Sequence, residues 1–586
     1  MGKAKIGLRA AVLASVAAMT LAACGGGGDG DGDSNGSGST GGEPAKGGTL
    51  TFLTVAEQFD HLDPQRNYTG EDLAFASGYL TRTLTAYKLS TDETEANTLV
   101  PDLATDTGTP SDDARTWTFT LKEGPTFEDG TPITCEDVKY GVSRTFATDV
   151  ITDGPQYAVA YLDIPKDKDG ASVYKGPYVT KGNDTAAFDK AVECNGQDIV
   201  FHLANPVADF NYTVTLTAFA PVPKAADTGE KYDDKIVSTG PYKIQEYSKN
   251  NQLVLVRNDN WDPETDDYRP AYPDSIVVKF GVEPSVRDQR IIRDSGEDKF
   301  SASRDSVDPS SLATAFNDPR MEDRRSDVLD AYSYYYGVDV KKVPNIEHRK
   351  ALAAALDRAQ IIKVSGGDFA GEVGDGVIKP NLPQDYAPSG MWSELLGQEI
   401  PDSGDPEYAK QLIADSGEPM PEICFNYSTP TRDKEAAVVK QSLEAAGIKV
   451  QLKPLEAGQY YSIVFDEKKA CPLMWLGWGP DWPNASTIIP ELFTPSGGFN
   501  LSRVDDKAFN DKVAQAQAET DRDAQAELWK ELNKEAMANV WAIPTRFGRS
   551  QLLAGSGVKA ASGEDGNTYA WSPYTSWSYA DLYVEE

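Results

Sequence analysis

One short segment, residues 475–484, combines an acidic side chain with several tryptophans. Its sequence is WLGWGPDWPN, which places Asp481 between Trp478 and Trp482. An acid flanked by aromatic side chains is a candidate functional group, because such surroundings perturb the pKa of a carboxyl group and perturbed groups cluster at functional sites. The alternative is a core position for the tryptophans, with Asp481 capping a turn before Pro483.

Groups that could catalyse a reaction are scarce. The chain has three histidines, His61, His202 and His348, and none belongs to a His-Glu-x-x-His metal motif. Stretches in residues 31–41 match a nucleophile elbow, a dinucleotide fingerprint and a calcium loop, but this low-complexity region lacks the strands and helices that such motifs need. We therefore expect no enzyme, no cofactor and no metal site, although paired-carboxylate glycosidases need no local signature.

The cysteines suggest structural crosslinks. Apart from Cys24, the chain contains Cys135, Cys194, Cys424 and Cys471, and their spacing does not match a zinc site. An even number favours disulfides in an oxidising compartment. Three pairings are open, and the nearest-neighbour choice joins Cys135 to Cys194 and Cys424 to Cys471. Each bridge would close a loop of about 50 to 60 residues and stabilise the fold by about 4 kcal/mol.

The amino terminus has the layout of an export signal. Lys3, Lys5 and Arg9 precede an apolar run at residues 10–23, which is shorter than a helix needs to span a membrane. The run ends in LAAC, which resembles a bacterial lipobox and implies lipidation of Cys24. We expect residues 1–23 to be removed and the mature protein to be tethered to the membrane by the acyl chains.

Composition defines a flexible linker and excludes some partners. Residues 24–48 are mostly Gly, Ser and Asp after the cysteine, so they cannot bury enough apolar surface to fold. The net charge is -35, with 91 acidic against 56 basic residues, which argues against a nucleic-acid partner. The same charge disfavours adhesion to anionic lipid headgroups and fits a soluble surface.

Hydrophobic periodicity indicates an α/β organisation. Residues 49–55 and 117–121 alternate like strands, and apolar residues over 73–87 recur at helical spacing. Thr134 and Asp137 have the spacing of a capping box at the start of a helix. The chain is long enough for two or three domains with cores of their own.

The clearest unit lies late in the chain. Its order is a strand at 423–427, a helix at 436–446, a strand at 448–452, a short helix from about residue 459 and a strand at 471–476. Gly447 ends the first of these helices. This alternation implies parallel pairing through right-handed crossovers, and a Cys424–Cys471 bridge would require the first and third strands to lie close together.

Five motifs, taken together, resemble one family. They are GGTLT at 47–51 with LDP at 62–64, FEDGTP at 127–132 with EDV at 136–138, STGPYKI at 238–244, RKAL at 349–352 with LDR at 356–358, and WLGWGPDWPN at 475–484. In order and spacing they are similar to the extracellular solute-binding proteins of ABC importers that handle dipeptides and oligopeptides (family 5). The resemblance extends from residue 47 to residue 484.

The resemblance implies a two-lobed α/β fold of the periplasmic-binding-protein type (class II, cluster C), with three domains and a hinge. Ligand bound between the lobes would favour their closure. The bounds that we predict are 49–90, 198–283 and 542–586 for the core domain of the first lobe, 91–197 for its additional domain, and 284–541 for the second lobe.

The resemblance also assigns site residues. Asp481 matches the aspartate that pairs with the α-ammonium of a peptide ligand, and the backbone of Trp478 and Gly479 would pair with the ligand's main chain. Trp478 and Trp482 would wall the pocket. The loop at 67–70 maps to a ligand-contacting loop of the first lobe, which makes Tyr68 and Thr69 weaker candidates, with a solvated surface loop as the alternative.

These features predict a lipid-anchored monomer on the extracytoplasmic face of the membrane, which captures peptides and delivers them to the permease subunits of an ABC importer. Two alternatives stay open. Some members of the family bind oligosaccharides or metal chelates, and the tryptophans could stack on sugar rings. A lipid-anchored hydrolase is the alternative from another class. The sequence does not give ligand length or side-chain preference.

Overall fold

The computed structural model describes residues 44–585. The predicted signal peptide and Cys24 lie outside these residues. Within residues 44–585, no helix is both long and apolar enough to cross a membrane.

The first sheet is built from strands far apart in the sequence. Its order is β11-β1-β10-β9-β8, with β1 (Thr49–Leu53), β8 (Tyr242–Ser248), β9 (Gln252–Arg257), β10 (Ser275–Lys279) and β11 (Ser301–Ser303). β1 is parallel to both of its neighbours, whereas β8, β9 and β10 pair antiparallel. The alternation in β1 buries Leu50 and Phe52, as its pattern predicts.

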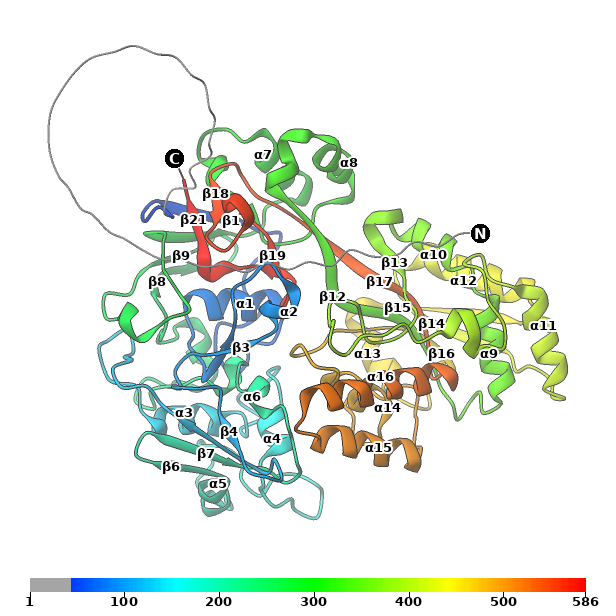
Figure 1. Ribbon diagram of the computed structural model, residues 1–586, viewed down its shortest axis with the longest axis horizontal. Helices are drawn as coiled ribbons and strands as arrows, with labels where there is room; N and C mark the ends of the chain where they lie inside the picture. Colours follow the sequence, from blue (N-terminus) through cyan, green and yellow to red (C-terminus); the bar gives the residue numbers. More distant parts are fainter. Residues whose placement is uncertain (1–43, 586) are drawn as a thin grey trace, which may run out of the picture. The chain divides into compact units, whose positions relative to one another are not determined.

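The second sheet carries the strand that leads to Asp481. Its order is β13-β17-β12-β16-β14-β15, with β12 (Arg325–Val338), β13 (Gly371–Val373), β14 (Ile423–Thr429), β15 (Val450–Glu456), β16 (Leu473–Trp478) and β17 (Ala542–Leu553). β14 pairs parallel with β15 and β16, which confirms the predicted parallel pairing, while β12 pairs antiparallel with β16 and β17. Figure 1 shows the two long strands β12 and β17 running from the region of β1 to the region of β14.

A third sheet and three small ones complete the strands. The third sheet, β4-β5-β7-β6, consists of β4 (Thr109–Pro110), β5 (Thr116–Thr120), β6 (Val192–Asn195) and β7 (Asp198–His202). The two-stranded sheets pair β2 (Thr85–Tyr87) with β3 (Leu99–Pro101), β18 (Val558–Ala560) with β21 (Leu582–Val584), and β19 (Ala570–Trp571) with β20 (Ser576–Trp577).

Helices precede, follow and connect these strands. Those up to residue 317 are α1 (Gly70–Tyr79), α2 (Glu93–Ala96), α3 (Cys135–Arg144), α4 (Tyr157–Tyr161), α5 (Thr185–Ala191), α6 (Phe210–Thr213), α7 (Pro284–Arg293) and α8 (Pro309–Asn317). Those that follow are α9 (Ile346–Ala355), α10 (Arg358–Ser365), α11 (Pro406–Asp415), α12 (Asp433–Ala445), α13 (Ala457–Val464), α14 (Ile489–Phe493), α15 (Lys507–Ala518) and α16 (Arg522–Ala538).

Two helix ends follow from local sequence. At the start of α3, the Thr134 backbone N–H and hydroxyl both donate to the Asp137 carboxylate, which confirms the capping box. α12 buries Ala436, Val439 and Leu443 and then ends before Gly447, whose φ of 78° suits a residue without a Cβ.

One predicted helix is shorter than its pattern. Apolar residues at helical spacing continue to Tyr87, but α1 ends at Tyr79 and Thr85–Tyr87 is strand β2. The carbonyl of Leu80 accepts hydrogen bonds from the distant backbone N–H groups of Thr239 and Gly240, both at 3.0 Å, so it is not available to continue the helix.

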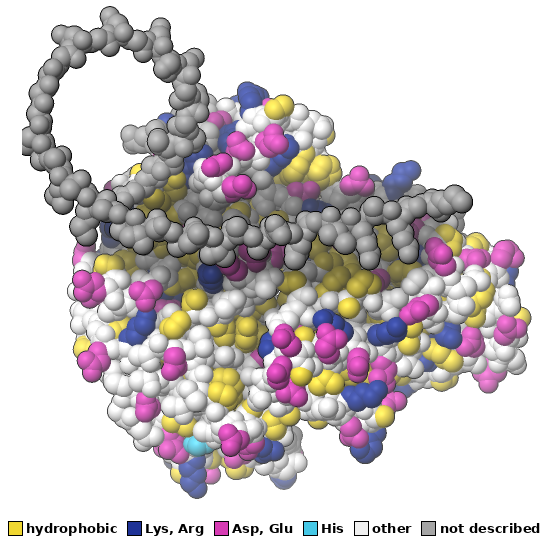
Figure 2. Space-filling view, viewed as in Figure 1, with side chains coloured by type: hydrophobic (Ala, Val, Ile, Leu, Met, Phe, Trp, Pro, Cys, Tyr) yellow, Lys and Arg dark blue, Asp and Glu magenta, His cyan; other side chains and the backbone are white. Residues whose placement is uncertain are grey.

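Two large hydrophobic cores correspond to the two lobes. One joins residues 50–302 to the carboxyl-terminal segment, and the other joins residues 335–543. The domain bounds stay a prediction. Strand pairing favours shifting two of them, since β11 pairs in the first sheet and β17 pairs in the second. The face in Figure 2 has acidic and basic side chains interspersed over both lobes.

Candidate functional site

Asp481 follows the carboxyl end of a central strand. β16 ends at Trp478 and lies between β12 and β14 in the second sheet. Gly479 and Pro480 lead the chain out of the strand, and the backbone N–H of Asp481 donates to the hydroxyl of Thr487 at 3.2 Å. Ligands of open α/β sheets bind outside the carboxyl ends of strands, so this position suits a binding group.

The surroundings of Asp481 come from both lobes. Its side chain accepts a hydrogen bond from the hydroxyl of Tyr157, which belongs to α4 of the first lobe. Burial raises its pKa to about 6, hydrogen bonding to Tyr157 and Tyr68 opposes this rise, and the charge of Glu491 adds to it. Asp481 is half-buried, and among residues 44–585 no Lys, Arg or His side chain forms an ion pair with it.

Trp478 belongs to a partly exposed aromatic wall. Its indole N–H donates to the carbonyl of Thr487 at 2.7 Å, and its ring packs on Phe499 with centroids 4.9 Å apart. Phe499 in turn contacts Tyr461 and Phe465, whose exposed fractions are 42% and 45%. A cluster of large aromatic side chains left exposed is unusual on a soluble surface and favours a binding role.

Trp482 occupies a different environment from the one predicted. It is buried, its indole N–H donates to Asp209 at 2.7 Å, and its ring lies 4.7 Å from that of Tyr157. Its side chain packs in the hydrophobic core of the first lobe. In this arrangement Trp482 joins the two lobes and does not form an open wall.

Gly479 allows a close approach of two strands. A Cβ at this position would lie 3.2 Å from the carbonyl oxygen of Ala331 and 3.3 Å from the ring of Tyr332.

The edge of β16 that faces β14 is only partly paired. β16 pairs with β14 only at Leu473 and Met474. In the described part of the chain, the β14-side edge of β16 therefore has no strand partner beyond Met474.

The structure separates the two loop candidates of the first lobe. Tyr68 is 38% exposed and interacts with Asp481. Thr69 precedes α1 and lines a neighbouring cavity of about 260 Å³ together with Glu71, Asp72 and Arg304. Tyr68 is therefore brought to Asp481, and Thr69 faces a second space beside it.

A basic cluster near the site was missed by sequence reasoning. Arg546 lies on β17, is only 6% exposed, and its Nε and Nη1 have no hydrogen-bond partner within residues 44–585. Arg432 and Arg546 share one carboxylate, that of Glu435, at 3.6 and 4.0 Å, which leaves one excess positive charge. Tyr157 was missed as well. β17 carries two arginines, Arg546 and Arg549, and nothing in the local sequence distinguishes the one without a hydrogen-bond partner at Nε and Nη1.

The basic cluster shares a sheet face with an exposed aromatic side chain near Asp481. Arg546 stacks on Tyr334 with its guanidinium 4.3 Å from the ring centre, and Arg432 lies 4.3 Å from the ring of Trp475. Tyr334 stacks on Tyr332, which is 47% exposed and whose pKa rises to about 12 through burial and the charges of neighbouring acids, Asp481 included.

Comparison with known proteins decides the family. The model of the bacterial extracellular solute-binding proteins, family 5 (middle), matches residues 98–500. The chain belongs to this family.

Relatives of this solute-binding protein are named as peptide binders. The oligopeptide-binding protein OppA of Bacillus subtilis is 24% identical over 434 residues, covering 72% of this chain and 74% of the relative. The dipeptide-binding protein DppE of the same organism is 22% identical over 468 residues, covering 77% and 79%.

A solved structure confirms the fold. The clavulanic acid biosynthesis oligopeptide binding protein 2 superposes with a TM-score of 0.82 at 27% identity, over 93% of this chain and 97% of the other. The predicted two-lobed α/β fold of the periplasmic-binding-protein type is thereby confirmed, and the family description places the protein outside the cytoplasm.

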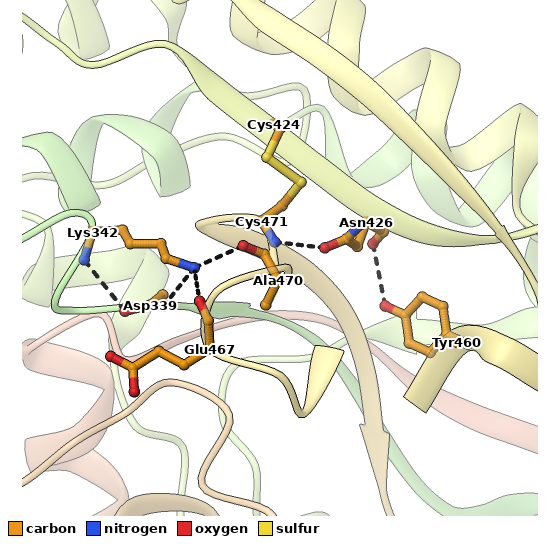
Figure 3. The surroundings of a disulfide bond; sticks show 8 residues. All are labelled: Asp339, Lys342, Cys424, Asn426, Tyr460, Glu467, Ala470 and Cys471. Atoms are coloured by element: carbon orange, nitrogen blue, oxygen red, sulfur yellow. Dashed lines mark hydrogen bonds and ion pairs between the residues drawn. A yellow bond between two sulfur atoms is a disulfide. The ribbon is translucent and has the colours of Figure 1, made fainter. Parts of the chain in front are cut away.

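Two disulfides have the pairing that we favoured from the sequence. Cys135 bonds to Cys194, and Cys424 bonds to Cys471. Figure 3 shows the second bridge, where the backbone N–H of Cys471 also donates to the Asn426 side chain at 2.6 Å. Tyr460 donates to the carbonyls of Asn426 and Trp475 at 3.2 and 2.5 Å. These bonds fix β16 against β14 and α13, and thereby position the chain that leads to Asp481.

Proposed function

We propose that this solute-binding protein captures short peptides outside the cell and delivers them to the permease subunits of an ABC importer. The observation that carries the proposal is the half-buried carboxylate of Asp481, which has neutral donors from Tyr157 and Tyr68 but no cationic partner among the described residues. The α-ammonium of a peptide would supply that partner, and the low-dielectric surroundings would strengthen the pair.

The open edge of β16 supports binding of a peptide main chain. A ligand extended beside Leu476, Gly477 and Trp478 would add a short strand to the sheet on the side that β14 leaves free. Main-chain hydrogen bonds give affinity without regard to side-chain identity, so a broad range of peptides would bind. The names of the relatives as oligopeptide and dipeptide binders support the same ligand class.

The basic cluster supports a ligand with charge at both ends. Asp481 and the pair of Arg432 and Arg546 are of opposite sign, and both lie next to exposed Tyr332 or its stacking partner Tyr334. A zwitterionic peptide could satisfy both, because the guanidinium of Arg546 keeps free N–H groups for a carboxylate. Thr69 remains a candidate contact through the adjoining cavity.

The protein would act by closure and not by a reaction. Contacts to Tyr68 and Tyr157 from one lobe and to Asp481 and Trp478 from the other would favour the closed state when a ligand is bound. We propose no enzymatic activity, and the relatives' names as binding proteins support this. We further propose a monomer that is held at the membrane by lipid on Cys24 after removal of residues 1–23.

Native mass spectrometry of protein purified from its own host tests the ligand class directly. We expect a co-purified peptide with a free amino terminus. A co-purified oligosaccharide or metal chelate would contradict the proposal and favour the alternative in which the aromatic wall stacks on sugar rings or holds a chelate. Incubation with peptides and oligosaccharides, followed by analysis for products, tests whether the protein is a hydrolase.

A further inference from the structure

Three consecutive hydrogen bonds connect the lobes at a position that the proposed ligand contacts do not use. The carboxylate of Asp209 accepts a hydrogen bond from the indole N–H of Trp482 at 2.7 Å and another from the hydroxyl of Ser486. The preceding residue, Ala208, donates its backbone N–H to the carbonyl of Gln517 at 3.1 Å. Asp209 and Ala208 come from the first lobe, and their three partners come from the second.

Each side of this contact is fixed in its own lobe. Asp209 directly precedes α6, whose first residue, Phe210, is fully buried in the first core. On the other side, the Asn484 side chain donates to Gln525 of α16 at 2.9 Å, and the Ala485 backbone N–H donates to Asp385 at 2.8 Å. The contact therefore joins two rigid supports.

The buried charge of Asp209 is stabilised mainly by the hydrogen bonds from Trp482 and Ser486. Its side chain is buried, and burial raises its pKa. Arg522 is the cation that most opposes this rise, but Arg522 itself makes a bidentate pair with Asp385 at 2.7 and 2.8 Å. A buried carboxylate whose direct hydrogen bonds come from the other lobe would lose them on lobe opening, so opening carries a free-energy cost there.

We infer that Asp209, Trp482 and Ser486 form a latch that holds the segment carrying Asp481 against the first lobe. Trp482 directly follows Asp481, so Asp209 acts as a positioning residue for the carboxylate without touching the ligand. The latch sets how often the ligand-free protein opens. It does not rest on the identity of the ligand, and it is tested without one.

Hydrogen–deuterium exchange of the ligand-free protein provides the test. Asp209→Asn removes the charge of the acceptor and thereby weakens the hydrogen bonds from Trp482 and Ser486. We therefore expect about tenfold faster exchange in residues 210–214 of the first lobe and in residues 485–488 of the second. The matched control is Asp581→Asn, a buried first-lobe carboxylate that accepts from the Ser562 backbone N–H. The control should leave exchange in residues 485–488 unchanged.

A second pair of variants excludes simple destabilisation. Trp482→Phe keeps a ring in the first core but removes the donor, and Ser486→Ala removes the other. In the protein that carries both changes, Asp209→Asn should not accelerate exchange further, because the bonds that it weakens are already absent. Faster exchange confined to residues 210–214, an equal response to Asp581→Asn, or additive effects of the three substitutions would each overturn the latch.

Discussion

The hydroxyl of Tyr157 donates a hydrogen bond to the carboxylate of Asp481 across 324 residues of chain. Tyr157 belongs to helix α4 of the first lobe, and Asp481 follows strand β16 of the second. A carboxylate has about four acceptor positions, so the hydroxyls of Tyr157 and Tyr68 leave room for the ammonium of a ligand. The bond therefore orients the acid and leaves its charge available.

Removing the charge of Asp481 should weaken the binding of free-amino peptides more than that of acetylated peptides. Asp481→Ala should weaken binding of a free-amino peptide by about 30-fold or more, because the ammonium would be buried without an opposite charge. The N-terminally acetylated form of the same peptide should lose far less. Isothermal titration calorimetry with both forms measures the difference, and an equal loss for both would refute the role of Asp481.

The affinity for peptides with a free amino terminus should depend on pH through Asp481. Burial raises the pKa of this carboxyl to about 6 in the ligand-free protein. The carboxylate form binds an ammonium, so affinity should be highest above pH 6 and should fall as the pH drops through 6 toward 4. Titrations between pH 4.5 and 8 test this, with Asp481→Asn as the control that should abolish the dependence.

The same raised pKa predicts a conflict between stability and binding. An acid whose pKa is raised by folding favours the folded state when protonated, and this contribution is lost as the pH rises through the folded pKa. At pH 8 Asp481→Asn should therefore stabilise the ligand-free protein by about 1 kcal/mol, after allowance for the partial exposure of the site. Near pH 4 the stabilisation should vanish. Thermal midpoints at both pH values provide the measurement, and equal midpoints at pH 8 would contradict it.

The regular units of the fold were predictable from the sequence, because their signals are local. The alternation at 423–427, the buried stripe of α12 and the stop at Gly447 each depend on neighbouring residues. The end of α1 depends instead on hydrogen bonds from Thr239 and Gly240, which no local pattern reveals.

The site was only half predictable for the same reason. The aspartate and tryptophans of 475–484 form a contiguous motif, whereas Tyr157 and Arg546 reach the site only through the tertiary fold. Trp482 shows the limit most clearly. Its sequence position suggested a pocket wall, but its side chain is buried in the core of the other lobe, where it donates to Asp209, 273 residues away.

Loss of the Tyr157 hydroxyl should change the titration of Asp481 without removing its charge. The hydrogen bond from Tyr157 lowers the pKa of Asp481, so Tyr157→Phe should move the pH midpoint of peptide binding upward. At pH 7 the affinity should fall by about fivefold, in line with the loss of one hydrogen bond. Tyr161→Phe on the same helix is the matched control, because Tyr161 packs on Tyr157 and makes no hydrogen bond to Asp481. An unshifted midpoint in Tyr157→Phe would contradict the assignment.

The two disulfides should differ in their effect on binding. Each closes a loop of 47 to 59 residues, so removing either should lower stability by as much as about 4 kcal/mol. Replacing Cys424 and Cys471 by alanine should also weaken peptide binding, because this bridge fixes the strand that leads to Asp481. Replacing Cys135 and Cys194 should leave affinity unchanged at temperatures where both variants are folded. Thermal midpoints measure the stability of both variants, and calorimetry measures their affinity for peptide. An equal loss of affinity in the two variants would show that the Cys424–Cys471 bridge has no role in positioning Asp481.

Arg546 should distinguish peptides by their carboxyl terminus. Its Nε and Nη1 are buried and have no hydrogen-bond partner among residues 44–585, so a ligand carboxylate would gain charge-assisted bonds there. Arg546→Met should weaken a peptide with a free carboxylate by about 10-fold and its amidated form much less. Arg549→Met is the control on the same strand, because Arg549 already pairs with Asp327 at 2.8 Å. If both peptides lose affinity equally in Arg546→Met, the basic cluster supports the sheet and takes no part in ligand binding. If only the peptide with a free carboxylate is affected, Asp481 and Arg546 contact the two ends of the bound peptide.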